Sequence, residues 1–198
     1  MTSAPRPRSV GARATAILNA LQSDEDFDRL ASSTALYASW WSTFTGYPIV
    51  SQFDLDTDTA PLFAEATKVL ALKSAVYELT GGNEQAAELL VAAPVDEMVH
   101  AVLAQHTLVV RMQARLGIEF VHMTDQERFG WRHGDYTHDC YEAAGWGTPP
   151  ARYWVDADEA SRRLSILDAR YASIGVHGGG RRVDLDFSAE PAAVASTG

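Results

Sequence analysis

The sequence predicts a mostly α-helical protein folded as a single domain. Apolar residues recur at the three- and four-residue spacing of helices over much of the chain, and only residues 182–187 alternate polar and apolar side chains as a strand does. The chain has 198 residues, 46% of them hydrophobic, which is enough to bury one core. We therefore expect a helical bundle with at most a short two-stranded β element.

The helical domain is expected to span residues 16–187, between two poorly ordered ends. Residues 1–15 carry three arginines and two prolines, a composition that predicts a flexible N-terminal arm. Residues 188–198 are rich in alanine, serine and proline and predict a disordered tail. No internal repeat divides the chain between these ends.

Helix boundaries follow from capping residues and helix breakers. Ser23 is followed by three acidic residues, which stabilise a helix N-terminus, and the apolar periodicity then continues until Gly46 and Pro48. Pro61, a residue favoured in a first helical turn, introduces a nearly all-apolar helix that ends at Gly81. Since that helix is apolar on most sides, we expect it at the centre of the core.

Residues 95–116 predict one long helix with a single apolar stripe, ended by Gly117. Shorter helices are expected at residues 84–92, at residues 135–144 and from Asp156 onward, where Asp156 and Glu159 form a capping pair. Residues 182–187 could form a strand that pairs with residues 119–123.

Charge and cysteine content restrict the class of partner. The net charge of −10 and the presence of only two lysines argue against binding to nucleic acid, which depends on clustered cations. No apolar run is long enough to span a bilayer, so we expect no membrane partner. The single cysteine cannot form an internal disulfide, which fits a reducing cytoplasm. The expected partner is a small molecule or another protein.

Five of the six histidines fall between residues 100 and 138, among acidic residues and the only cysteine. Imidazole, carboxylate and thiol groups bind transition metals or transfer protons near neutral pH. Asp96 and His100 are four residues apart, so the carboxylate can hold one ring nitrogen and leave the other free, although an ordinary surface pair has the same spacing. His106 falls within the apolar stripe and could equally be a buried core histidine.

His133, His138 and Cys140 form a second group of candidate ligands. Their spacing matches no metal-binding signature of understood geometry, such as paired Cys-x-x-Cys or His-Glu-x-x-His. The same residues would also serve as a loop and a helix start, with Cys140 as a small core residue. We therefore treat them as secondary candidates.

Three short stretches, Val-Asp-Glu-Met-Val-His at residues 95–100, His106-Thr107 and Phe120-Val121-His122, resemble part of a known family. They are similar to the motif of the small bacterial relatives of the glycine-rich-domain-containing-protein-like family, over roughly residues 60–155. The chain keeps Asp96, His100, His106 and His122 of that motif but has Val99 at the family's Trp, Val110 at its Tyr, Ala114 at its Cys and Met123 at its second His. The resemblance implies a helical fold and the location of a site, in which His133, His138 and Cys140 would replace the missing groups unless the site is degenerate.

Two functional hypotheses remain open. In the first, the helix with Asp96 and His100 meets the turn at His122 in a pocket, where His100, His106 and His122 bind a divalent metal, iron or zinc. Asp96, His100 and His122 would then perform metal-assisted or metal-free acid/base chemistry on a small biosynthetic metabolite. In the second, a non-catalytic module binds a protein or peptide through exposed tryptophans. The candidates are Trp40, Trp41, Trp131, Trp146 and Trp154.

Overall fold

The computed structural model describes residues 4–40, 46–123 and 130–184. Within these ranges the chain forms eight α-helices, one short 3-10 helix and one two-stranded antiparallel sheet, so the predicted mostly α class is confirmed. None of the described helices combines the length and the apolar character needed to cross a membrane.

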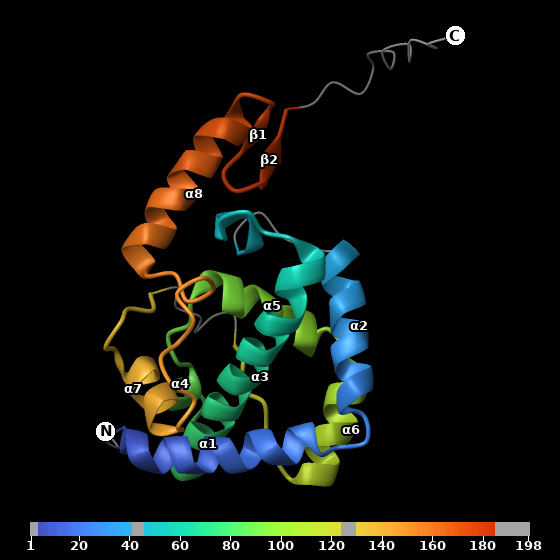
Figure 1. Cartoon of the computed structure of the whole chain (residues 1–198), viewed down its shortest axis with the longest axis vertical. Helices are drawn as coiled ribbons and strands as arrows, with labels where there is room; N and C mark the ends of the chain where they lie inside the picture. Colours follow the sequence, from blue (N-terminus) through green and yellow to red (C-terminus); the bar gives the residue numbers. More distant parts are fainter. Residues whose placement is uncertain (1–3, 41–45, 124–129, 185–198) are drawn as a thin grey trace.

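Helix α3 (Leu55–Leu79) runs through the middle of the molecule (Figure 1), as its apolar sequence predicts. Most of its residues are buried, including Leu62, Leu70 and Val76. The helix begins six residues before the predicted start at Pro61. Asp54 explains the difference, because its side chain accepts a hydrogen bond from the backbone N–H of Thr57 and caps the helix there.

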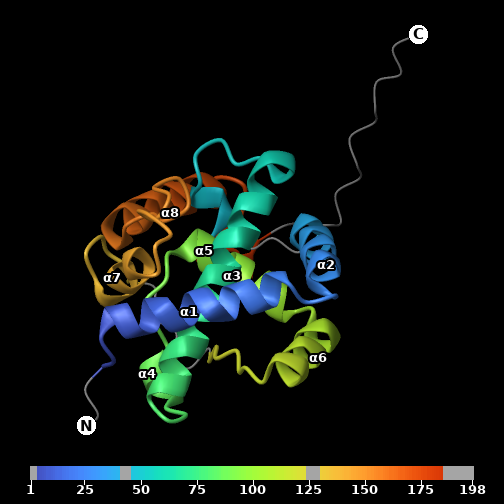
Figure 2. The same ribbon diagram turned by 60° about the horizontal axis from the view of Figure 1, so that its bottom comes forward.

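Helix α1 (Pro7–Gln22) crosses α3 and also packs on α7 (Tyr136–Ala143), as Figure 2 shows. The predicted flexible arm is therefore wrong for residues 7–15. Val10 and Ala14, four residues apart, are both fully buried on the inner side of the helix. The predicted tail, residues 188–198, lies outside the described residues.

Close packing of α1 on α7 depends on Gly11. A Cβ atom at this position would lie 2.5 Å from the carbonyl carbon of Ala143, closer than any ordinary contact. Two hydrogen bonds secure the same interface: the Tyr136 hydroxyl donates to the Pro5 carbonyl at 2.7 Å, and the Thr15 hydroxyl donates to the Ala144 carbonyl at 2.9 Å. These contacts fix the N-terminal helix to the body of the protein.

The predicted long helix over residues 95–116 is wrong, because the structure divides it into α5 (Ala93–Leu103) and α6 (His106–Leu116). Gln105 leaves the helical conformation with a ψ of 44°, and its side-chain amide donates to the Ala101 carbonyl at 3.2 Å. A side-chain amide at this position replaces the backbone donor that a continuous helix would supply.

The remaining elements cover the core around α3. The predicted N-terminal cap at Ser23 is wrong, because Ser23 ends α1, where its hydroxyl donates to the Asn19 carbonyl at 2.8 Å, and helix α2 (Phe27–Trp40) begins four residues later. Gly46 and Pro48 lead into the 3-10 helix η1 (Tyr47–Ile49). Helix α4 (Glu84–Ala87) is shorter than the predicted 84–92, and Asn83 caps it. Its short length leaves residues 88–92 as an extended connection to α5.

Helix α8 (Ala157–Ala172) and the hairpin of β1 (Val176–His177) and β2 (Arg182–Val183) form one end of the molecule (Figure 1, top). Asp156 caps α8, as the sequence predicts, but Glu159 does not complete the predicted capping pair, because its carboxylate pairs with Arg162 and Arg163. The predicted pairing of the strand with residues 119–123 is wrong, since β2 pairs with β1. Three consecutive glycines, all with positive φ, make the tight turn that brings the two strands together.

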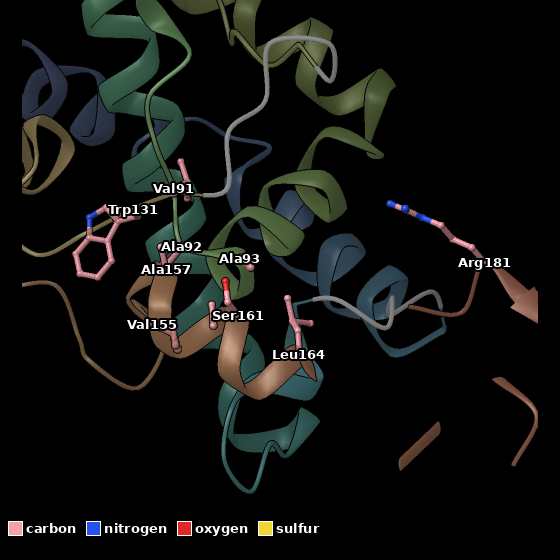
Figure 3. A pocket seen from close by; sticks show the side chains of 11 residues that line it. Val91, Ala92, Ala93, Trp131, Val155, Ala157, Ser161, Leu164 and Arg181 are labelled. Atoms are coloured by element: carbon pink, nitrogen blue, oxygen red, sulfur yellow. The ribbon is translucent and has the colours of Figure 1, made fainter. Parts of the chain in front are cut away.

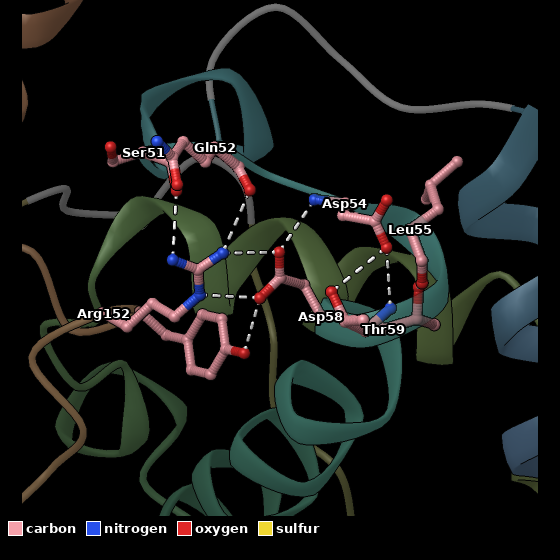
Figure 4. Close-up of polar contacts among 9 residues, drawn as sticks. Ser51, Gln52, Asp54, Leu55, Asp58, Thr59 and Arg152 are labelled. Atoms are coloured by element: carbon pink, nitrogen blue, oxygen red, sulfur yellow. Dashed lines mark hydrogen bonds and ion pairs between the residues drawn. The ribbon is translucent and has the colours of Figure 1, made fainter.

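Two buried carboxylates of α3, Asp58 and Glu65, accept hydrogen bonds from the segment before α8 and from α7. Asp58 accepts hydrogen bonds from the Arg152 guanidinium at 2.7 and 2.8 Å and from the Tyr153 hydroxyl at 2.8 Å (Figure 4). Glu65 accepts from the Trp154 indole at 2.8 Å and from the Tyr141 hydroxyl at 3.0 Å. The Arg152 guanidinium holds the pKa of Asp58 far below its usual range, against the opposing effect of burial.

Candidate functional site

Helix α5 carries two of the candidate site residues on one side. Asp96 lies in the first turn of the helix and is buried, while His100 lies one turn later with 43% of its side chain exposed. The Nε2 atom of His100 is 3.5 Å from Oδ2 of Asp96, the arrangement that the four-residue spacing predicts. The carboxylate therefore lies inside the fold and the imidazole faces outward.

His122 lies next to Asp96 and His100 and comes from the extended segment that follows α6. The backbone of this segment is tied to the core helix α3, since the Ser74 hydroxyl donates to the Glu119 carbonyl at 2.6 Å. The rings of His100 and His122 lie edge to face with centroids 4.6 Å apart. One potential ligand atom each from Asp96, His100 and His122 lies within 4.8 Å of the others.

A buried ion pair supports His122 from inside the protein. The side chain of Lys73 is 1% exposed, and its Nζ lies 2.8 Å from Oε2 of Glu88 and 3.2 Å from Nδ1 of His122. The other Glu88 oxygen accepts from the backbone N–H of Met123 at 2.6 Å. Lys73 and Glu88 thus fix both the ring of His122 and the backbone that follows it.

The lysine determines which nitrogen of His122 can react. An ammonium group only donates hydrogen bonds, so Nδ1 is the acceptor from Lys73. The ring proton, or a metal ion once that proton has left, is then carried by Nε2. Glu88 offsets the charge of Lys73, and the buried Asp96 carboxylate adds a negative group on the His100 side of the site.

Sequence reasoning missed Lys73 and Glu88. The signal for Lys73 was nevertheless present, because it is one of only two lysines in the chain and lies in the middle of a nearly apolar helix. A buried lysine needs a partner to offset its desolvation. No comparable signal marks Glu88, which comes from a different part of the sequence and meets Lys73 only in the folded chain.

His106 does not share this site. It was expected in the buried stripe of a continuous helix. The helix is interrupted at Gln105, however, and His106 becomes the exposed first residue of α6. Within the described ranges, the only group of three close metal-ligand side chains is Asp96, His100 and His122. The expectation that His106 is a third histidine ligand, or a buried core residue, is therefore wrong.

Among the described residues, the secondary candidates His133, His138 and Cys140 occupy positions that serve the fold and not a metal site. The rings of His133 and His138 lie 4.2 Å apart, but together with Cys140 they form no three-ligand group in the part of the chain that the structure describes. Asp135 caps α7 by accepting from the backbone N–H of His138 at 2.9 Å, so this segment does form the predicted helix start. Cys140 is fully buried, and burial raises the pKa of its thiol to about 12. A thiol with that pKa is neither a ready nucleophile nor a ready ligand at neutral pH.

Most of the tryptophans proposed as anchors for a protein partner are covered. Trp131 and Trp154 are buried and Trp146 is half-buried in the described chain, while Trp41 lies outside the described residues. Trp40 is the exception, with 76% of its surface exposed beside the exposed Leu36 on α2. Among the described tryptophans, Trp40 on α2 is therefore the one that is available to contact a protein partner.

Comparison of the chain with protein-family models, with curated proteins and with solved structures finds no match. The resemblance seen in the sequence motif therefore remains an expectation. The geometry of the Asp96, His100 and His122 group supplies the basis for a functional proposal.

Proposed function

We propose that Asp96, His100 and His122 bind a divalent transition metal ion, zinc or iron(II), which acts on a small molecule. The observation that carries the proposal is the approach of one ligand atom from each residue to within 4.8 Å of the others. Two imidazoles and one carboxylate make up the protein ligands of several catalytic zinc sites and of non-haem iron(II) sites. The three ligands found among residues 4–40, 46–123 and 130–184 leave coordination positions open for water or substrate.

A small movement of one side chain would complete the coordination. Bonds of about 2 Å place neighbouring ligand atoms of a tetrahedral metal roughly 3.3 Å apart. His100 is the group that can move, because much of its side chain is exposed, whereas Asp96 is buried and His122 is held by Lys73. Rotation of the His100 ring toward the other two side chains would therefore close the site around an ion.

The surroundings suit a catalytic metal better than a purely structural one. A structural site is closed by four protein ligands, whereas the described part of the chain offers three here, and the group faces solvent on the side of His100. A metal held there polarises a bound oxygen or activates a bound water. Lys73 and Glu88 support the proposal as the outer residues that keep the His122 ring in one orientation. The substrate would be a small metabolite with an oxygen donor.

Calorimetric titration of the untagged, metal-stripped protein with zinc tests this proposal. The wild-type protein is expected to bind one equivalent, and His100→Ala is expected to weaken binding about a hundredfold, since it removes one of three ligands. His100 is a suitable site for substitution because its exposed side chain contributes little to the core. His106→Ala is the matched control, an exposed histidine from the adjacent helix. Equal affinities of wild type and His100→Ala would refute the proposal.

A further inference from the structure

A cavity of about 390 Å³ lies between α8, the start of α5 and the indole of Trp131 (Figure 3). This volume falls in the range of small-molecule binding sites. The walls are mainly apolar and come from segments far apart in the sequence. They include Val91, Ala92, Trp131, Val155, Ala160 and Leu164. None of these residues belongs to the proposed metal site.

The inner face of helix α8 lines this cavity. Ala157, Ala160, Ser161 and Leu164 follow the spacing of one helix face, and all four line the cavity. None of the sixteen residues of α8 is buried, although a helix of this length on a globular protein ordinarily buries its apolar stripe against the core. Apolar surface on α8 is therefore left for a bound molecule to cover.

Arg181 provides a positive charge at the far end of the cavity. Its side chain extends from the turn between β1 and β2, and Figure 3 shows it on the opposite side from Trp131. The adjacent Arg182 pairs with Asp184 at 3.1 Å, whereas in residues 4–40, 46–123 and 130–184 the structure shows no carboxylate paired with the Arg181 guanidinium. A guanidinium next to an apolar wall matches a ligand that has an anionic end and an apolar body.

We propose that this cavity binds a small carboxylic acid with a hydrocarbon body. The hydrocarbon lies against Trp131 and Leu164, the carboxylate pairs with Arg181, and the Ser161 hydroxyl is the polar side chain available along the wall. Burial of the hydrocarbon supplies most of the binding free energy, and the ion pair selects the charge of the ligand. This site is independent of the proposed metal site.

Calorimetric titration with decanoate, kept below its micelle concentration, tests the proposal, with decylamine as the probe of equal length and opposite charge. Wild-type protein is expected to bind one equivalent of decanoate and to bind decylamine at least about tenfold more weakly. Arg181→Gln should reduce decanoate affinity about tenfold and remove the preference between the two probes. Arg182→Gln is the matched control, an arginine one residue away that already has a partner, and it should bind as wild type does.

A second variant tests the location of the hydrocarbon. Ala160→Phe fills the cavity from the outer helix α8, where no residue is buried, and should abolish binding of decanoate while the far-ultraviolet circular dichroism spectrum stays unchanged. His100→Ala should leave decanoate binding unchanged, which separates this site from the metal proposal. The inference is overturned if wild type shows no saturable decanoate binding, if decylamine binds equally well, or if Arg181→Gln binds decanoate as wild type does.

Discussion

The Nζ atom of Lys73 lies 3.2 Å from the Nδ1 atom of His122, with the Glu88 carboxylate on its other side at 2.8 Å. This contact links the central helix of the core to the proposed metal site. It also explains why a lysine occupies a nearly apolar helix, since its ammonium group contacts Glu88 and His122 within the fold. The orientation of His122 is therefore set by the interior of the protein.

The Lys73–Glu88 pair predicts non-additive effects on stability. Lys73→Met leaves the buried Glu88 carboxylate without its cation and should lower the free energy of unfolding by about 3 kcal/mol. Adding Glu88→Gln removes that uncompensated charge and keeps an acceptor for the Met123 N–H, so the double variant should be more stable than Lys73→Met alone. Urea unfolding of Lys73→Met, of Glu88→Gln alone and of the double variant measures this coupling. Strictly additive losses would show that the two side chains do not act as a pair.

The contact between Asp58 and Arg152 predicts a pH dependence of stability. Hydrogen bonds from Arg152 lower the pKa of Asp58 in the folded protein, so the stabilisation is fully present above the unfolded pKa of about 4 and is lost as the pH falls toward the folded pKa. Asp58→Asn should lower the free energy of unfolding by about 2 kcal/mol at neutral pH, a value that allows for the partly exposed guanidinium.

Urea unfolding from neutral pH down to about pH 2 checks this prediction. The difference between wild type and Asp58→Asn should shrink below about pH 4, where the unfolded wild-type carboxyl becomes protonated. Arg152→Met should show the same loss of acid dependence, because it removes the cause of the shift. A difference that stays constant across this range would mean that the contact contributes no net linkage to protons.

Gly11→Ala should destabilise the protein, contrary to the usual effect of this substitution in a helix. Alanine ordinarily gains about 1 kcal/mol over glycine in a helix interior. Here the added Cβ meets the backbone of Ala143 at 2.5 Å, and backbone atoms of α7 cannot move aside as a flexible side chain can. Thermal unfolding should show a lower Tm for Gly11→Ala, whereas an unchanged or higher Tm would mean that α1 does not lie against α7 as described.

Local signals in the sequence predicted several elements correctly. Asp135 and Asp156 cap α7 and α8 where their sequences indicate, and the apolar helix from residue 61 onward is the core helix. Capping depends on residues two or three positions apart, so it can be read locally. The errors arose where distant contacts decide the outcome. Helix α1 packs on α3 and on α7, which is more than a hundred residues away, and the break at Gln105 carries none of the usual proline or glycine.

The candidate site was predictable only in part for the same reason. The spacing of Asp96 and His100 indicates their common helix side, and the motif resemblance includes His122. The exclusion of His106 depends on the helix break, and the contribution of Glu88 depends on how the extended segment before α5 packs on α3. Neither follows from periodicity, because both are set by tertiary packing.

The thiol of Cys140 should be unreactive in the folded protein. Burial is the main cause that raises its pKa to about 12, and the side chain has no exposed surface. Labelling with iodoacetamide at neutral pH should therefore be slow under native conditions and rapid after denaturation in urea, as measured by intact mass. Rapid native labelling would contradict the buried position of Cys140 and restore it as a candidate reactive group.

Anomalous X-ray diffraction can locate a metal ion bound by Asp96, His100 and His122. Data would be recorded from crystals of metal-loaded protein above and below the absorption edge of the metal. One strong difference peak is expected about 2 Å from a carboxylate oxygen of Asp96 and from a ring nitrogen each of His100 and His122. A peak at His106 or at the His133–His138 pair instead, or no peak among the three side chains in crystals grown with saturating metal, would contradict the proposed metal site.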